Sequence, residues 1–183
     1  MKDMRNRAPP DPALLCLPNI PKPLHGVAPR VIMGRIRWDE MRHAAYAEAG
    51  FRCQACGVEK HMAQYHPWLE AHEVYGYDYE RGRLVFLRLA ALCHACHNFI
   101  HDGRMQMMVE AGEMTEAMYK AILGHGKGIL AKAGLLARWR RRHSHRCIIP
   151  WNGWRLVFEG KEYGPSTQSM GEWVEGQWRN WKP

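Results

Sequence analysis

Long apolar segments are missing from this sequence of 183 residues. No run approaches the roughly 20 apolar residues that a transmembrane helix needs, so the sequence predicts no membrane partner. The start of the chain is basic, but the apolar run that follows, ALLCL, is short and is bounded by proline. The hydrophobic segment of a secretory signal is therefore also missing, and we expect a cytoplasmic protein.

Acidic residues are scarce relative to basic ones. The chain has 18 Asp and Glu against 26 Lys and Arg, which gives a formal net charge of +8 and a pI near 9.4. Such a balance favours a polyanionic partner over an acidic small substrate, so we expect nucleic acid. The hydrophobic content of 46% is sufficient for a buried core.

Cysteines number only six, and a reducing compartment argues against a disulfide framework. Four of them form two Cys-x-x-Cys pairs, Cys53 with Cys56 and Cys93 with Cys96. A tight turn can direct each pair of thiolates at one ion, and four such ligands are what a structural tetrahedral zinc site requires. The other two cysteines stand alone and are expected to be free thiols.

Two other interpretations compete for these cysteines. The run from Cys93 to His97 also matches the C-x-x-C-H pattern of covalent haem attachment. That chemistry requires an exported chain and leaves Cys53 and Cys56 unexplained. A redox dithiol needs a strand-then-helix context with a resolving role, which neither pair has. Zinc accounts for all four cysteines together.

Several histidines and carboxylates are left over once zinc is assigned. If a helix starts within the second cysteine pair, His97 and His101 lie four residues apart on one face, a spacing that suits one divalent ion. A strand that carries Glu70, His72 and Glu73 is expected opposite this helix. The sequence therefore predicts a second, functional metal site.

The order of these patterns divides the chain into four parts. Prolines and basic residues predict an extended arm at the start, and a basic run ends the third part. The predicted parts are an extended arm over 1–36, a zinc-bound core over 37–105, a helical region over 106–146, and a Trp-rich hairpin plus helix over 147–183.

Local signals predict the elements within these parts. A helix is expected with Asp39 as its N-cap and Gly50 as its stop, followed by two strands in WLEAHEVY and GRLVFLRL. Two further helical patterns are separated by GHGKG. The run RWRRRHSHR has five arginines and no acid, and it is interpreted as a phosphate-binding face or as a solvated helix end. Its arginines are Arg138, Arg140, Arg141, Arg142 and Arg146.

Over about residues 46–104, the order C-x-x-C, LEAHEV, hairpin and ALCHACHNFIH resembles the HNH endonucleases of the ββα-metal fold. The resemblance implies an α+β fold with a small ββα-metal (HNH) core held by a four-cysteine zinc site, followed by helical and hairpin-helix C-terminal extensions. The end HNFIH is similar to the H-x-x-x-H helix of colicin-type nucleases, which implies that His97 and His101 bind a catalytic ion. The flanks are similar to those of HNH proteins in phage genomes, which implies a bacterial or phage-infected host cell.

Two positions depart from the family pattern. Arg88 stands where the family usually has asparagine, and the family's Asp-His or His-His pair reads His72-Glu73. Alignment with the frequent LEVHHI implies that His72 is a metal ligand and Glu73 the general base. The rival register makes His72 the base but leaves Ala71, which has no donor atom, at the ligand position. His72 and Glu73 cannot both face the helix from a regular strand.

The resemblance thus implies an endonuclease that hydrolyses phosphodiester bonds in DNA, with a duplex as the expected substrate. A structural Zn2+ would be separate from one catalytic divalent ion, which could be Mg2+, Mn2+, Ni2+ or Zn2+. The alternatives are a weakly active or inactive zinc-stabilised DNA-binding protein and a scaffold within a nucleoprotein assembly.

Overall fold

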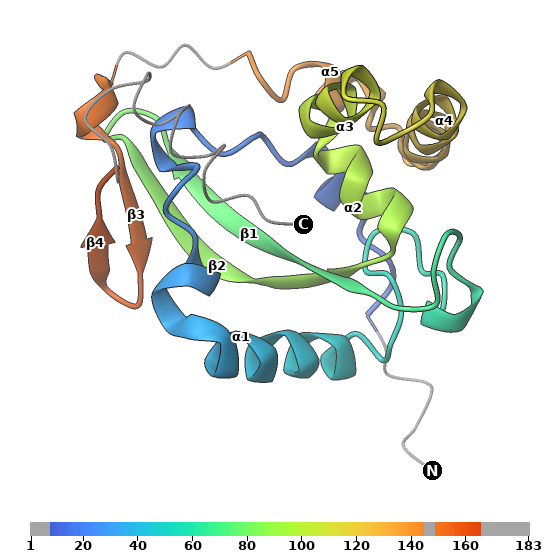
Figure 1. Cartoon of the computed structure of the whole chain (residues 1–183), viewed down its shortest axis with the longest axis horizontal. Coiled ribbons are helices and arrows are strands. Elements are labelled where there is room, and N and C mark those ends of the chain that lie inside the picture. Colours follow the sequence, from blue (N-terminus) through green and yellow to red (C-terminus); the bar gives the residue numbers. More distant parts are fainter. Residues whose placement is uncertain (1–7, 145–148, 166–183) are drawn as a thin grey trace. The chain divides into compact units, whose positions relative to one another are not determined.

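The computed structural model describes residues 8–144 and 149–165, and it has a mixed α+β architecture (Figure 1). Four strands form one sheet, in the order β1 (Glu70–Asp78), β2 (Arg83–Leu92), β3 (Arg155–Phe158) and β4 (Lys161–Tyr163). The chain forms two compact units. The cysteine unit comprises Met1–Asn19, Met41–His72 and Leu89–Ser144, and the sheet unit comprises Ile20–Glu40, Glu73–Arg88 and His145–Pro183.

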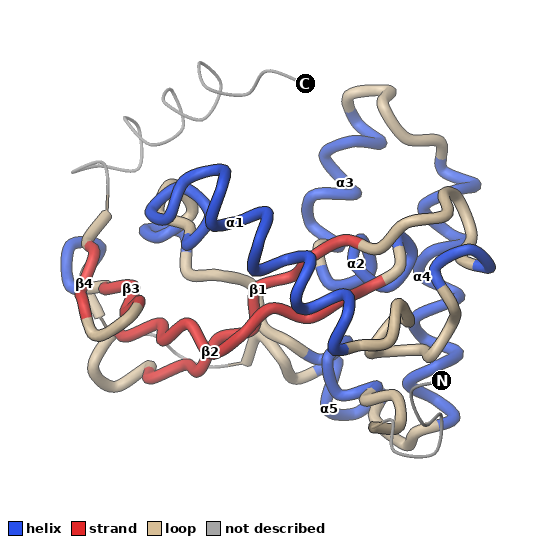
Figure 2. Tube along the Cα trace, turned by 90° about the horizontal axis from the view of Figure 1, so that it is seen from below, coloured by secondary structure: helices blue, strands red, loops and turns tan. Residues whose placement is uncertain are grey.

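The two predicted strands are present as β1, Glu70–Asp78, and β2, Arg83–Leu92. They lie side by side, as Figure 2 shows, and the short connection between them is compatible only with an antiparallel hairpin. The Asp78 carboxylate shapes this connection by accepting backbone hydrogen bonds from Glu80 and Arg81 at 3.1 and 2.9 Å. The hairpin thereby brings the start of β1 next to the end of β2.

The proline-rich segment is packed, which corrects the prediction of an extended arm. It forms two short 3-10 helices, Pro12–Cys16 and Lys22–Leu24. Leu15 is fully buried in the cysteine unit, and Leu24 is buried in the sheet unit. The fixed φ of proline is compatible with such short helical turns. Burial of the leucines favours packing over an extended conformation. Residues 1–7 lie outside the described part.

Helix α1, Pro29–Glu48, begins earlier than predicted. Asp39 lies inside it and is not an N-cap, which corrects that prediction. Gly34 has φ 73° and ψ 172°, so it interrupts the helical conformation within this span. Gly50, the predicted stop, has φ 59° just after the last helical residue, a conformation that glycine adopts without strain.

Helix α4, Glu116–Lys132, runs without a break through GHGKG, so the predicted split into two helices is wrong. Its N-cap is Thr115, whose side chain accepts a hydrogen bond from the Met118 backbone N–H. Glycine is needed at position 126 for packing, because a Cβ there would lie 2.2 Å from the Phe99 ring. The packing of α4 and its buried face outweigh the low helix propensity of its glycines.

The remaining helices of the cysteine unit are α2, His94–Ile100, α3, Asp102–Glu110, and α5, Leu136–Arg140. Helix α2 follows β2 directly and packs against α4. Within residues 8–144 and 149–165, no helix is both long enough and apolar enough to cross a membrane.

The sheet unit contains the predicted C-terminal hairpin, formed by β3, Arg155–Phe158, and β4, Lys161–Tyr163. Glu159 and Gly160 both have positive φ, which is typical of the two-residue turns that match the twist of a hairpin. Strand β3 also pairs in parallel with β2, an arrangement that the sequence does not predict. The predicted Trp-rich helix lies in the part of the chain that is not described.

Candidate metal centres

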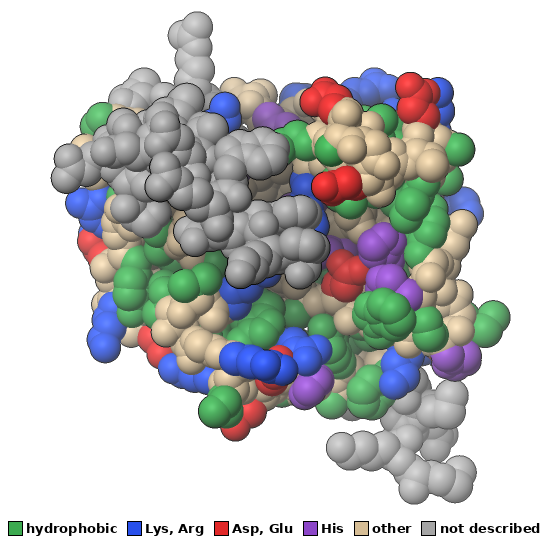
Figure 3. Space-filling view, viewed as in Figure 1, with side chains coloured by type: hydrophobic (Ala, Val, Ile, Leu, Met, Phe, Trp, Pro, Cys, Tyr) green, Lys and Arg blue, Asp and Glu red, His purple; other side chains and the backbone are tan. Residues whose placement is uncertain are grey.

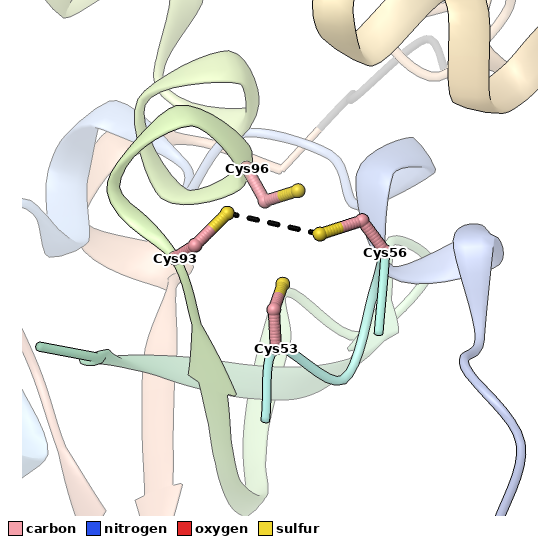
Figure 4. A group of neighbouring side chains, drawn as sticks. All are labelled: Cys53, Cys56, Cys93 and Cys96. Carbon is pink, nitrogen blue, oxygen red and sulfur yellow. Dashed lines mark hydrogen bonds between the residues drawn. The ribbon is translucent and has the colours of Figure 1, made fainter. Parts of the chain in front are cut away.

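The four predicted zinc ligands converge at one point of the cysteine unit. Figure 4 shows their sulfurs directed at a common centre, and these ligand atoms lie within 4.8 Å of one another. The Sγ atoms of Cys56 and Cys93 are 3.8 Å apart, which is about the edge of a zinc tetrahedron with Zn–S bonds of about 2.3 Å. Cys53, Cys56, Cys93 and Cys96 can therefore hold a metal ion such as zinc.

A tight turn positions the first cysteine pair. The Cys53 N–H donates to the Val58 carbonyl at 2.9 Å, and the Gly57 N–H donates to the Cys53 carbonyl at 2.8 Å. Gly57 has φ +80°, and a Cβ at this position would lie 2.8 Å from Cγ of Pro10. Glycine thus allows both the left-handed turn and the close approach of the packed N-terminal segment.

Gln54 joins the two cysteine pairs, which are far apart in the sequence. Its N–H donates to the Ala91 carbonyl at 2.8 Å, and its side-chain Oε1 accepts from the Ala91 N–H at 2.9 Å. Ala91 lies in β2, two residues before Cys93 of the second pair. These hydrogen bonds hold the first turn against the end of the strand, so both pairs face the same ion position.

The electrostatics of the cluster favour a bound cation when all four cysteines are ionised. Hydrogen bonds to Cys53, Cys56 and Cys93, together with burial, raise the pKa of the Cys96 thiol far above its usual range. Four thiolates cannot share this buried volume unless a positive ion compensates their charge. His125 of α4 places Nε2 at 3.5 Å from the Cys96 sulfur. No sequence pattern links His125 to the cysteines, because the tertiary packing of α2 on α4 brings it to the cluster.

The structure also brings together the three predicted histidine ligands, His72 of β1 and His97 and His101 at α2. One ligand atom from each lies within 4.8 Å of the others. His72 is buried, and its Nδ1 has no hydrogen-bond partner. Burial, with further contributions from His101 and His97, lowers the pKa of His72 well below its usual value. The imidazole is therefore neutral, with a lone pair available to a metal ion.

Glu70 orients one of these ligands. The Nδ1 of His97 donates a hydrogen bond to Glu70 Oε2, which leaves the His97 Nε2 lone pair for an ion. Burial alone would raise the pKa of Glu70, but hydrogen bonds from His94 and His97 lower it well below the usual range. Sequence analysis placed Glu70 on the strand without a role. Its position two residues before His72, on the same face of a strand, was the available signal.

Glu73, the expected general base, does not join the predicted ligands. It follows His72 directly in β1, which is unbroken from Glu70 to Asp78, so its side chain alternates to the opposite face. Among the described residues, none of the candidate metal-binding groups includes Glu73. Glu70 is the residue whose carboxylate forms hydrogen bonds with His94 and His97.

A third group consists of His66, Glu70 and His94. Glu70 Oε1 lies 2.9 Å from His66 Nε2 and 2.6 Å from His94 Nδ1, and these two nitrogens are 2.9 Å apart. The ring of Trp68 stacks on that of His66 with a centroid distance of 3.8 Å. Histidine side chains gather beside an acidic one on the face shown in Figure 3. Neither His66 nor His94 belongs to a metal-binding group predicted from the sequence.

The predicted basic run divides into exposed and buried arginines. Arg138, Arg140 and Arg141 are exposed. Arg142 is 8% exposed, its guanidinium lies 4.4 Å from the centre of the Trp139 ring, and it forms an ion pair with Asp102. Arg142 therefore stabilises the cysteine unit and is not available to phosphates, which corrects its prediction as a nucleic-acid ligand. Arg146 lies outside the described residues.

Comparisons with known proteins gave no match to a protein-family model, a curated protein or a solved structure. The function is therefore inferred from the chemistry of the three candidate metal-binding groups.

Proposed function

We propose that this protein is a metal-dependent HNH-type endonuclease that hydrolyses phosphodiester bonds in DNA. The cluster of His72, His97 and His101 carries the proposal, because it unites the three imidazoles that the resemblance implies as ligands of a catalytic ion. The order β1, β2, α2, with a cysteine cluster at the strand–helix junction, supports assignment of a ββα-metal core.

The three histidines fit a divalent ion. The buried, unpartnered Nδ1 of His72 and the hydrogen bond between His97 and Glu70 are properties of metal ligands and their supports. Such an ion would stabilise negative charge on the scissile phosphate and on the leaving oxygen. A site of imidazoles suits Mn2+, Ni2+ or Zn2+ better than Mg2+, which prefers oxygen ligands.

Glu70 has a positioning role in this proposal. Its carboxylate fixes the tautomer and ring orientation of His97, so that the Nε2 lone pair points away from the hydrogen bond. Glu73 has no part in the proposal, because its side chain leaves β1 on the face opposite to that of His72.

Incubation of the protein with plasmid DNA tests the proposal directly. We expect cleavage with Mn2+ or Ni2+, and loss of cleavage after mild chelation that leaves one tightly held zinc per chain, because four thiolates bind zinc more strongly than three imidazoles bind these ions. Binding of DNA without cleavage under any of Mg2+, Mn2+, Ni2+ or Zn2+ would support the alternative, a zinc-stabilised DNA-binding protein.

The exposed arginines are expected to supply affinity for the DNA backbone. Neutralising Arg138, Arg140 and Arg141 together with glutamine should weaken binding to all sequences and reduce the log–log salt slope by about 0.9 for each phosphate that is no longer neutralised. Fluorescence anisotropy over a salt series measures both effects. A control with equal loss of charge changes Arg35, Arg81 and Lys161, which are exposed, to glutamine. Equal slopes for the two triple variants would contradict a role for the basic run.

A further inference from the structure

The group of His66, Glu70 and His94 has the geometry of a metal site that is separate from the three-histidine cluster. We propose that it binds a second divalent transition-metal ion through two imidazoles and one carboxylate. The site stands on its own distances, so it does not depend on the proposed nuclease activity. Its ligands come from the loop before β1, from the start of β1 and from the first turn of α2.

The distances among the donor atoms fit one ion. His66 Nε2, His94 Nδ1 and Glu70 Oε1 form a triangle with sides of 2.9, 2.6 and 2.9 Å. Neighbouring ligands of an octahedral ion with bonds of about 2.1 Å are about 2.9 Å apart. Three lone pairs directed at one face of such an ion leave its other positions open for water or a substrate oxygen.

Hydrogen bonds alone do not satisfy this triangle. Each ring nitrogen can carry one proton, and that proton can point along only one side of the triangle. If both nitrogens donate to Glu70, two donors face each other at 2.9 Å between His66 and His94. If His66 Nε2 donates its proton to His94 Nδ1, or the reverse, the donating nitrogen no longer has a proton for a hydrogen bond to the Glu70 carboxylate. A cation attracts all three donor atoms at once.

The surroundings hold the ligands in place. His66 stacks on Trp68, and the preceding residue, Tyr65, has φ 82°, a strained conformation for a residue with a side chain. The Nδ2 atom of Asn98 donates to the His94 backbone carbonyl at 3.0 Å and lies 3.2 and 3.1 Å from the two ring nitrogens of His94, so the amide packs against this ring. Such fixed ligands reduce the entropy lost on ion binding.

Glu70 links this site to the three-histidine cluster. Its Oε1 belongs to the triangle, and its Oε2 accepts the hydrogen bond from His97. The side chains of His66 and Glu70 remain 13% and 23% exposed, so an ion can reach the triangle from solvent. Two imidazoles favour Mn2+, Fe2+, Co2+, Ni2+ or Zn2+ over Ca2+.

A Mn2+ titration of the zinc-loaded protein, with free Mn2+ followed by electron paramagnetic resonance, tests the second site. Mn2+ does not displace zinc from four thiolates. We expect two Mn2+ ions per chain in the parent, and one in His66→Ala, in His94→Ala and in His101→Ala. His61→Ala changes a histidine of the same connection that is 64% exposed, and it should still bind two.

Retention of the cysteine-bound zinc shows in each variant that the unit is folded, and two different ligand substitutions guard against a local folding defect in one of them. A parent stoichiometry of one that survives both His66→Ala and His94→Ala would overturn the second site. Two bound ions without DNA cleavage would support the second site and contradict the proposed nuclease.

Discussion

Replacement of Cys96 by serine is expected to abolish zinc binding and to unfold the cysteine unit. Cys96 is fully buried among three other sulfurs, and among the described residues the cysteine group offers no fifth thiolate to replace it. Binding of a structural zinc contributes about 10–16 kcal/mol in zinc-finger peptides, whereas the total stability of a typical domain is only about 5–15 kcal/mol. Elemental analysis and circular dichroism measure the losses of metal and of structure.

Cys16 provides a matched control for this substitution. It is also buried, but its sulfur lies near the Leu135 carbonyl, 3.9 Å away, and it does not belong to the cysteine cluster. Cys16→Ser should therefore keep one zinc per chain and the parent's circular dichroism spectrum. If Cys96→Ser behaves in the same way as Cys16→Ser, the cysteine cluster does not hold a structural metal.

Cleavage is expected to fall by about 10²-fold or more in His101→Ala, because this substitution removes a ligand of the ion that stabilises the transition state. Glu70→Gln should lower the rate by about 10–100-fold, since the amide cannot support His97 as a carboxylate does. Glu73→Gln should cut DNA at the parent's rate, because Glu73 alternates away from His72 along β1. Single-turnover cleavage of a labelled duplex with Mn2+ measures all three rates.

The comparison of Glu70→Gln with Glu73→Gln tests two predictions against each other. The structure favours a role for Glu70, whereas the alignment with LEVHHI favours Glu73 as the general base. Both substitutions exchange a carboxylate for an amide of the same shape on the same strand, so each is the control for the other. A large loss in Glu73→Gln with normal cleavage in Glu70→Gln would restore Glu73 as the general base. It would also mean that β1 bends at this position in the active enzyme.

Short spacings in the sequence were sufficient to predict much of the candidate site. Two Cys-x-x-Cys pairs and the four-residue step from His97 to His101 fix ligands within one turn of backbone, so their grouping depends on local geometry. The segments WLEAHEVY and GRLVFLRL, separated by a turn-rich link, predicted β1 and β2 in the same way, and the glycine at position 50 predicted the end of α1.

The tertiary structure decided the features that depend on packing between distant segments. GHGKG alone indicates a break, but α4 continues because Gly126 packs against Phe99. The sequence does not distinguish the arginines of the basic run from one another. In the structure, Arg142 is buried by its contacts with Asp102 and Trp139. Both features depend on the free energy of packing between distant segments, which outweighs helix propensity in α4. Local sequence patterns give no information about that packing.

Local spacing was thus enough to predict the four cysteines of one metal group and the three histidines of another. The tertiary structure was needed to show that Glu70, rather than Glu73, belongs to a candidate metal group among the described residues, and that His66 and His94 are the other members of that group. Along a strand, side chains alternate between the two faces, so the strand itself fixes which of its residues share a face. The residues that contact each face come from a loop and a helix that fold against the strand, and local patterns do not predict them.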